Sequence, residues 1–385
     1  MPRTVTPRLR ALALGTLWLV WIWLLAAVAS RATPWLAKNH GWPCDVMSRV
    51  VPLARWDSGW YVSLAERGYS RPPAKAGEET DHAFFPLYPG LTRLTSNALG
   101  IETSRAGGLV SAAAFLVALV LFAEWTTAHF GAARSGPAVA VLLAFPTSFF
   151  FAAVYTESLL LALALAAVLA AERDHPLTAA AAGLLSGLTR VSGIVLAPYL
   201  FVCSLRRSRA QGSPPLRAFA LASFVGLSPL AGFGLFCLYF WRKFGDPLLF
   251  VRAQHNWGPK AKTIMDGPYL LWETVVEDIS SGKIYTHGFG RTLEGIFFLV
   301  FAFFAMRLVT EKKPLEALYV VATIGIVPVS GTFESMGRYV LPAFPAFAAL
   351  AALASRRSLF GLYLTASFLL QAGYVWAFVN WYWTG

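Results

Sequence analysis

Apolar residues occupy most of this chain in long runs, and short polar segments separate these runs. The first run covers residues 11–30, and the others follow at intervals to residue 380. An α-helix needs about 20 residues to cross the hydrocarbon core of a bilayer, and several runs approach or exceed that length. They do not alternate polar and apolar positions as the strands of a membrane barrel do. Since backbone polar groups in lipid must be paired within the protein, each run is predicted to be a helix.

The predicted membrane segments cover residues 11–30, 106–130, 136–153, 157–171, 177–205, 218–241, 292–309, 315–330, 338–354 and 358–380. The run 177–205 is long for one span and is interrupted at Thr189-Arg-Val-Ser-Gly193. We therefore expect a re-entrant or short helical hairpin there, with Arg190 at its tip. This gives about 11 crossings. The predicted fold class is an all-α polytopic membrane protein, in which residues 1–385 form a single integral membrane domain.

Composition and charge agree with a membrane location. Of the 385 residues, 57% are hydrophobic and only 14% are charged, whereas soluble domains carry about 25% charged residues. The net charge is +12, and the densest basic loop contains Arg206, Arg207, Arg209 and Arg217. Because basic loops face the cytoplasm, this charge indicates topology rather than a nucleic-acid partner, with attraction to anionic membrane lipids as a second interpretation. Residues 31–105 and 242–291 then form two long outer loops.

The first outer loop contains two segments that have helical periodicity but are too polar to span a membrane. One apolar face is formed by Leu53, Trp56, Trp60 and Leu64, at spacings of three and four residues. Gly68 is placed to end this helix, and a second short helix is predicted between Pro89 and Gly100. Because tryptophan favours the headgroup region, we expect amphipathic juxtamembrane helices that lie in the membrane interface.

Asp57 is the candidate catalytic residue. It lies between Trp56 and Trp60 at the predicted membrane surface, where a partly desolvated carboxylate is suited to accept a proton from a hydroxyl. Tyr61 is four residues further on and faces the same side of the helix. The alternative is that the Asp57 carboxylate caps the helix by accepting backbone N–H groups. The two roles are compatible.

Further candidates for substrate binding are Arg55, His82, Arg190 and Arg338. Arginine at membrane depth is costly and normally has a partner or a function. A phosphate group is a natural partner, because the guanidinium binds it through two N–H groups. The alternative is that these arginines only reach from helix ends to the membrane surface. His82 precedes two phenylalanines, so it could be a base, a metal ligand or a loop residue.

The second outer loop combines aromatic and amide side chains in the segments Phe244-Gly-Asp-Pro247 and Gln254-His-Asn-Trp257. Gln254 and Trp257 suit sugar recognition, because aromatic rings stack on pyranoses and amides bond to hydroxyls. The alternative is an ordered loop packed against the first one. The sequence has no Gly-rich phosphate cradle, Asp-x-Asp pair or metal-spaced Cys and His. No metal or cofactor is therefore predicted, and a sugar donor would be lipid-linked.

The stretch Arg55-Trp-Asp-Ser-Gly-Trp-Tyr61, with Ala65-Glu-Arg-Gly-Tyr69 and Phe84-Phe-Pro-Leu-Tyr-Pro89 after it, resembles the PIG-V-type mannosyltransferases of the GT-C glycosyltransferase superfamily. Later blocks of bacterial members are similar to Thr189-Arg-Val-Ser-Gly193, to Phe244-Gly-Asp-Pro247 with Gln254 and Trp257, and to Arg338-Tyr-Val-Leu-Pro342. The resemblance runs through most of the chain in order, and its first block is the most specific. The Ala-, Arg-, Gly- and Pro-rich composition suggests a GC-rich bacterium.

This resemblance implies a GT-C fold and transfer of mannose from a polyprenyl-phosphate-mannose donor to a glycolipid or glycan acceptor. The reaction would invert the anomeric carbon on the extracytoplasmic face of the bacterial plasma membrane. Asp57 matches the family's expected base. Arg190, Arg338 and Arg55 would stabilise the phosphate leaving group. The sugars would be positioned by His82, Tyr61, Gln254 and Trp257, and Trp56 and Trp60 complete the candidate substrate-binding set.

Two other functions remain open from the sequence. The same fold could use another lipid-phosphate sugar, such as glucose or arabinose. A lipid or lipid-sugar transporter is the alternative from another class, and it would be marked by inverted repeats or by charges on broken helices at the membrane midplane. The charges of this chain gather instead in the outer loops, which favours chemistry at the membrane surface.

Overall fold

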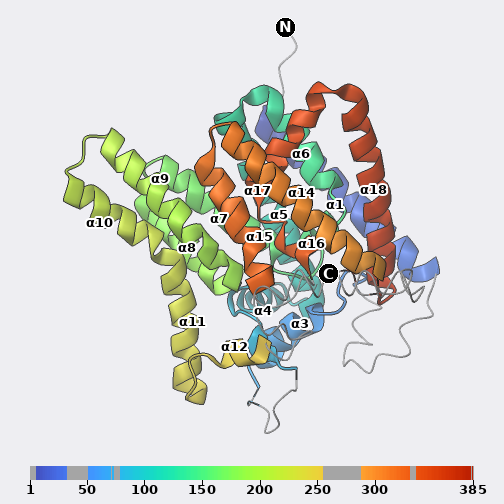
Figure 1. Cartoon of the computed structure of the whole chain (residues 1–385). Coiled ribbons are helices and arrows are strands. Elements are labelled where there is room, and N and C mark those ends of the chain that lie inside the picture. The colour runs from blue at the N-terminus through green and yellow to red at the C-terminus, as the bar shows by residue number, and fades with distance from the viewer. Residues whose placement is uncertain are drawn as a thin grey trace.

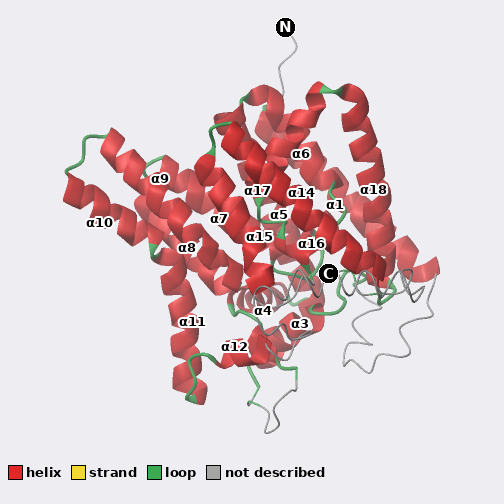
Figure 2. Cartoon of the chain, in the orientation of Figure 1, coloured by secondary structure: helices red, strands yellow, loops and turns green. Residues whose placement is uncertain are grey.

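The computed structural model describes residues 6–32, 51–70, 72, 79–254, 288–329, 335–382 and 384. Within these ranges all regular secondary structure is helical, as Figure 2 shows. The α-helices are α1 (Pro7–Ala32), α3 (Ser58–Arg67), α4 (Leu87–Leu99), α5 (Thr103–Phe130), α6 (Ala132–Ala144), α7 (Glu157–Glu172), α8 (Pro176–Thr189), α9 (Leu196–Ala210), α10 (Pro215–Gly226), α11 (Ser228–Phe244), α12 (Leu249–Gln254), α14 (Gly288–Thr310), α15 (Pro314–Val329), α16 (Met336–Tyr339), α17 (Phe344–Leu350) and α18 (Arg357–Val379). The 3-10 segments are η2 (Asp81–Ala83), η3 (Ser148–Phe151), η4 (Val191–Val195) and η6 (Ala351–Ser355).

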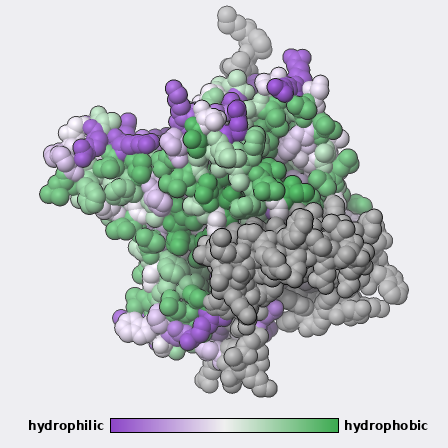
Figure 3. Space-filling view, in the orientation of Figure 1, coloured by the Kyte–Doolittle hydropathy of each residue, from purple (hydrophilic) through white to green (hydrophobic). Residues whose placement is uncertain are grey.

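Four of these helices are long and apolar enough to cross a membrane, namely α1, α5, α14 and α18. Helices α10 and α11 meet the same criteria together, as a pair bent by 45°. In Figure 3 hydrophobic residues form a broad band across the molecule, between hydrophilic groups at its upper and lower ends. The predicted all-α membrane fold is thus confirmed for the described residues. The predicted count of about 11 crossings is not established, because only these helices of the described residues are long and apolar enough to cross a membrane.

Helix α5 forms the centre of the molecule (Figure 1). It packs against α1, α6 and α7, and it also contacts α3 and α4. Its side chains Phe115, Phe122 and Trp125 are fully buried. Helices α3, α4 and α12 lie together at the lower end of the view, opposite the N-terminus. The α5 helix therefore connects the end of the molecule that carries the short interfacial helices to the end that carries the N-terminus.

The amphipathic helices predicted in the first outer loop are α3 and α4. The first begins later than the periodicity from Leu53 suggests, because Trp56 has a left-handed backbone with φ of 54° and cannot continue a right-handed helix. Gly68 and Gly100 follow the two helices with φ of 72° and 64°. Glycine adopts this conformation without the clash that a Cβ would cause. Both predicted helix ends are therefore confirmed.

The run 136–153 forms a shorter helix than the hydrophobic pattern predicts. Helix α6 ends before Phe145, since the residue that precedes a proline avoids the helical conformation, and Pro146 comes next. The buried amide of Gln371 on α18 donates hydrogen bonds to the carbonyls of Leu143 and Phe145, at 2.9 and 2.8 Å. The carbonyl groups at this buried helix end therefore have partners, and the chain continues into η3.

A proline also bends the predicted span 218–241 into the pair α10 and α11. Pro229 has no N–H to donate to the carbonyl of Val225, one helical turn earlier. The hydroxyl of Ser228 donates to that carbonyl instead, at 2.7 Å. The hydrogen-bonding capacity at the bend is thus retained while the helix axis turns.

Two other predicted spans are broken next to an arginine that the sequence singles out. The expected interruption of 177–205 is confirmed, because α8 ends at Thr189 and Arg190 is extended, with φ of −164° and ψ of 153°. The run 338–354 is not one helix, because Pro342 separates α16 from α17, whose first turn contains Pro345, and the run ends in η6. Arg190 therefore lies directly after α8, and Arg338 lies in the one-turn helix α16.

Candidate active site

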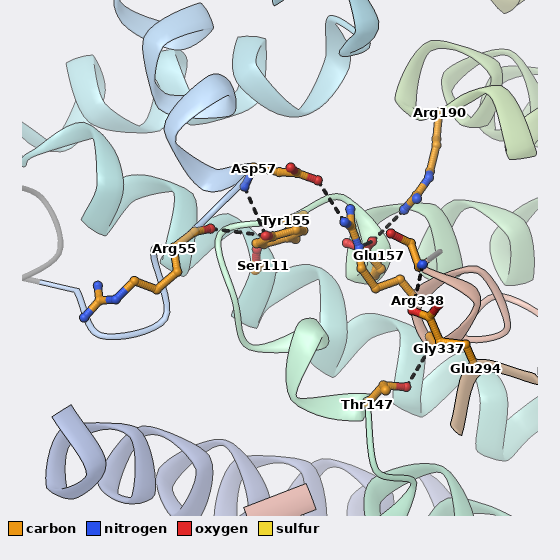
Figure 4. Close-up of polar contacts among 11 residues, drawn as sticks. Arg55, Asp57, Ser111, Thr147, Tyr155, Glu157, Arg190, Glu294, Gly337 and Arg338 are labelled. Atoms are coloured by element: carbon orange, nitrogen blue, oxygen red, sulfur yellow. Dashed lines mark hydrogen bonds and ion pairs between the residues drawn. The ribbon is translucent and has the colours of Figure 1, made fainter. Parts of the chain in front are cut away.

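Four charged side chains from separate parts of the chain meet in one buried cluster, shown in Figure 4. The Arg338 guanidinium donates from Nη1 to Asp57 Oδ2 at 2.8 Å and from Nε to Glu157 Oε1 at 3.0 Å. Arg190 Nη1 donates to the same Glu157 oxygen at 2.5 Å. The structure thus brings together three residues singled out by the sequence and adds Glu157. These four residues are called the charged cluster below.

Asp57 directly precedes α3, where an aspartate often caps the free N–H groups of a helix. Its side chain makes no such bond and turns toward Arg338 instead. The Asp57 backbone N–H donates to the hydroxyl oxygen of Tyr155 at 3.2 Å, and that hydroxyl donates to the carbonyl of Arg55 at 3.1 Å. The carboxylate position is therefore fixed by its backbone and by a cation rather than by helix capping.

Glu157 is the first residue of α7, and its side chain is 1% exposed. A helix N-terminus favours negative charge, and both cluster arginines contact the Oε1 atom of Glu157. Its Oε2 atom is buried and has no hydrogen-bond partner among the described residues. Glu157 was not predicted from the sequence. The available signal was an acidic residue that opens an apolar run, since an ionisable group at membrane depth marks a site.

Aromatic faces support both arginines of the cluster. The Arg190 guanidinium carbon lies 4.0 Å from the centre of the Tyr339 ring, and that of Arg338 lies 4.5 Å from the Tyr155 ring. Such cation–π contacts stabilise a cation most when it is removed from water. The side chains of Arg338 and Arg190 are 4% and 12% exposed. The arginines are thus pre-oriented with their planar donors beside the two carboxylates.

The chemistry available to the charged cluster follows from its balance of charge. Two guanidinium groups face two carboxylates, so the four side chains are neutral as a set. Removing such charges from water costs several kcal/mol per ion, roughly, before pairing offsets it. The cluster offers a carboxylate that can accept a proton and two planar cations that can bind a phosphate. Proton acceptance and stabilisation of an anionic leaving group are therefore available in one place.

The aromatic candidates of the first outer loop pack around the cluster. Tyr61 is buried and meets the rings of Tyr155, Tyr88 and Phe84 edge to face, with centroids 6.0, 5.3 and 5.1 Å apart. Burial raises the pKa of the Tyr61 phenol well above its usual range, so this group stays protonated. Trp60 stacks on Phe84 at 5.9 Å. These rings form one wall beside the charged cluster.

Arg55 is buried, but its guanidinium extends away from Asp57 (Figure 4). Its Nε donates to the carbonyl of Val379 at the end of α18, at 3.0 Å, and its Nη1 donates to the carbonyls of Val51 and Ala54. The guanidinium also lies over the Trp381 ring, 5.4 Å from its centre. In this structure Arg55 therefore satisfies backbone carbonyls and fastens the first outer loop to α18. Trp56 meets the same Trp381 ring at 5.6 Å.

His82 lies in a separate buried cluster that joins the first outer loop to α11. Its Nε2 is 3.2 Å from the carbonyl of Ser70, its Nδ1 is 3.2 Å from Asp81 Oδ1, and the Tyr69 and Phe244 rings pack on it. Burial lowers the pKa of the His82 imidazole, while the neighbouring Asp81 carboxylate opposes that shift. These contacts fix the loop rather than present the ring to the charged cluster.

The two candidates from the second outer loop are placed only in part. Gln254 is the last residue of α12 and is half-buried. Trp257 lies outside the described residues. Across the part of the chain that the structure describes, no three His, Cys, Asp or Glu side chains group as metal ligands. Asp57 and Glu157 are instead bridged by a shared arginine.

Comparison with known proteins supports the resemblance predicted from the sequence. The model of the Mannosyltransferase (PIG-V) family matches residues 42–211. This range includes Asp57, Glu157 and Arg190, whereas Arg338 lies beyond it. A search of the curated proteins finds no significant match.

Solved structures with a similar arrangement include two of ArnT from Cupriavidus metallidurans. The apo structure has a TM-score of 0.49 and 17% identity, over 80% of this chain and 56% of that chain. The structure bound to undecaprenyl phosphate has a TM-score of 0.49 and 16% identity, over 94% and 64%. The Archaeoglobus fulgidus oligosaccharyltransferase, in complex with zinc and sulfate, has a TM-score of 0.44 and 12% identity, over 96% and 53%. This chain thus spans little more than half the length of the first of these proteins.

Proposed function

We propose that this chain, which resembles the PIG-V mannosyltransferases, is a membrane glycosyltransferase that uses a lipid-linked sugar. In its specific form the proposal is transfer of mannose from a polyprenyl-phosphate-mannose donor to a glycolipid or glycan acceptor, with inversion at the anomeric carbon. The observation that carries it is the Asp57 carboxylate, which leaves its helix-capping position to lie 2.8 Å from a buried arginine. A proton acceptor beside a phosphate-binding cation suits this reaction.

Asp57 is the general base of the proposed reaction. Its Oδ2 atom is occupied by Arg338, and its Oδ1 atom has no hydrogen-bond partner among the described residues. The acceptor hydroxyl would give its proton to this carboxylate as the hydroxyl oxygen attacks the anomeric carbon. A positioned base typically contributes about 10²–10⁴ in rate. Attack opposite the phosphate forms the new C–O bond as the old one breaks, which inverts the anomeric configuration.

Arg338 and Arg190 stabilise the polyprenyl phosphate that leaves. In the structure their charges are balanced by Asp57 and Glu157, so a donor phosphate must compete with these carboxylates. Transfer of the Arg338 contact from Asp57 to the phosphate would also release the base from its neighbouring cation. Donor binding and activation of Asp57 are thereby coupled. Such prearranged charge is usually the largest single contribution to catalysis.

The proposed orientation places the charged cluster on the extracytoplasmic face. The basic residues at the end of α9 and the start of α10 are exposed, and the connection between these helices lies toward the end of the molecule that carries the N-terminus in Figure 1. Figure 3 shows hydrophilic groups gathered at that upper end, where Lys312 and Lys313 follow α14, Arg356 follows η6 and Arg357 begins α18. The positive-inside rule assigns this end to the cytoplasm. The opposite end, with α3 and α4, then faces outward from the bacterial plasma membrane.

The experiment that tests the function is label transfer by the purified protein in lipid. Polyprenyl-phosphate mannose, glucose and arabinose donors would be compared, each with a bacterial membrane lipid extract as the acceptor. A labelled product from the mannose donor alone supports the specific proposal. Product from another donor keeps the glycosyltransferase and changes the sugar. No product from any donor, with labelled lipid moved between vesicle leaflets, would favour the transporter instead.

A further inference from the structure

The α16 helix, which carries Arg338, is only four residues long. A single helical turn is unstable on its own, because nucleation fixes several residues for few hydrogen bonds. The position of the Arg338 guanidinium is therefore set by contacts that α16 makes with other elements. Two side chains from other elements hydrogen-bond to the backbone here, one to α16 and one to the residue before it, and both bonds are drawn in Figure 4.

The first contact precedes α16. The backbone N–H of Ser335 donates to Glu294 Oε1 on α14, at 2.8 Å. Ser335 has φ of 68°, a left-handed conformation that is unfavourable for a residue with a Cβ. Glu294 is buried, so its bond to this N–H is little screened by water. The carboxylate therefore holds a strained residue directly before α16.

The second contact lies within α16. The Thr147 hydroxyl donates to the carbonyl of Gly337 at 2.6 Å. Thr147 directly precedes η3, yet its side chain does not cap that segment. A Cβ added to Gly337 would lie 2.7 Å from the Thr147 methyl group, which is too close for any real side chain. Glycine thus permits the approach, and the hydroxyl bond fixes α16 against the segment that follows α6.

We propose that Thr147 and Glu294 are positioning residues that place the Arg338 guanidinium between Asp57 and Glu157. Both hold the backbone directly before Arg338, at Ser335 and at Gly337, and neither touches the proposed reacting atoms. The inference deepens the proposed function, because it assigns Thr147 and Glu294 the task of aligning the cation with the leaving phosphate. A misplacement of about 1 Å in such a group can lower a rate by about 10².

The test uses matched variants at Thr147. Thr147→Val keeps the branched shape and the methyl group but removes the hydroxyl, whereas Thr147→Ser keeps the hydroxyl. We expect Thr147→Val to lower kcat by tenfold to about a hundredfold, with little change in KM for the acceptor. Thr147→Ser should stay within about threefold of wild type. Glu294→Leu should resemble Thr147→Val, and Glu294→Gln, which keeps an acceptor oxygen, should restore part of the rate.

A double-mutant cycle with Arg338→Gln separates positioning from general packing. If Thr147 acts through Arg338, Thr147→Val should lower kcat less than about twofold in the Arg338→Gln background. Equal losses in both backgrounds, or a wild-type kcat for Thr147→Val beside an impaired Arg338→Gln, overturn the inference. If wild type transfers no sugar, the proposed function fails instead. In that case the same four proteins are compared by thermal unfolding. If the shifts in Tm caused by Thr147→Val and Arg338→Gln simply add, Thr147 does not position Arg338.

Discussion

Ion pairs between arginine and a carboxylate occur at both ends of the molecule, but they are exposed at one end and buried at the other. At the end with the N-terminus, Glu124 pairs with Arg8 and Arg173, whose side chains are 62% and 46% exposed. At the other end, the Arg338 side chain is 4% exposed and bridges Asp57 and Glu157. Both arrangements join separate helices through carboxylates and guanidinium groups. They differ in their access to water.

That difference in access to water changes what each kind of pair contributes to stability. Exposed pairs contribute about 0–1 kcal/mol, because water screens them and long side chains lose entropy. Buried pairs often stabilise less than apolar residues of the same size, because their desolvation is costly. The buried cluster is therefore poorly explained as a device for stability. Its arrangement fits the proposed reaction, in which the phosphate of a donor meets the hydroxyl of an acceptor.

The largest effect is expected from Arg338→Gln. This change leaves Asp57 and Glu157 buried with less compensation, which should lower the free energy of unfolding by about 3–5 kcal/mol. Loss of the cation should also lower the transfer rate by about 10²–10³. Both are measured on purified protein, by thermal unfolding and by label transfer.

Arg55→Gln is the matched control, because it removes a buried arginine outside the cluster. A comparable loss of kcat in a folded Arg55→Gln variant would show that the effect is not specific to the charged cluster.

The arrangement of the charged cluster marks the limit of what the sequence predicts. The spacing of apolar residues gives the long helices, α3 and α4, and the break at Arg190. The hydrophobic pattern cannot show that Pro146 and Pro342 end helices early within apolar runs, since hydropathy averages over such residues. It also cannot show that residues 281 positions apart, such as Asp57 and Arg338, are in contact. That contact depends on how the helices pack.

Individual side chains show the same limit. Glu157 was missed because one acid at the start of an apolar run resembles a helix-end charge. Arg55 and His82 were grouped with the site by residue type, because an arginine at membrane depth suits a phosphate and a histidine can act as a base. The structure instead directs the Arg55 guanidinium to the end of α18 and packs His82 against α11. Residue type therefore identified the polar region but not the direction of each side chain.

A smaller effect is expected from pH at His82. Burial lowers the pKa of the folded imidazole below the unfolded value of about 6.5. The unfolded state therefore binds the proton more readily, so stability is full above about pH 6.5 and falls as the pH is lowered toward the folded pKa. We expect Tm to fall between about pH 7 and pH 5, and to fall less in His82→Gln, which cannot take up this proton. If the Tm of wild type and of His82→Gln depended on pH in the same way, His82 would not be the source of that dependence.

The smallest effect is expected at the exposed pairs. Glu124→Gln should change the free energy of unfolding by less than about 1 kcal/mol, because both of its arginine partners remain solvated. Transfer activity should stay at the wild-type level, since Glu124 lies at the end of the molecule opposite the charged cluster. Urea or thermal unfolding and label transfer measure the two quantities. A decrease of several kcal/mol in the free energy of unfolding would show that exposed and buried ion pairs do not differ as described.

The most direct test of the central claim is the transfer rate of Asp57→Asn. Asparagine keeps an oxygen that can accept the bond from Arg338, so the geometry is retained while the proton acceptor is lost. We expect the rate to fall by about 10²–10⁴ while Tm shows that the protein stays folded. A folded Asp57→Asn protein with the full wild-type rate would show that this carboxylate is not the base.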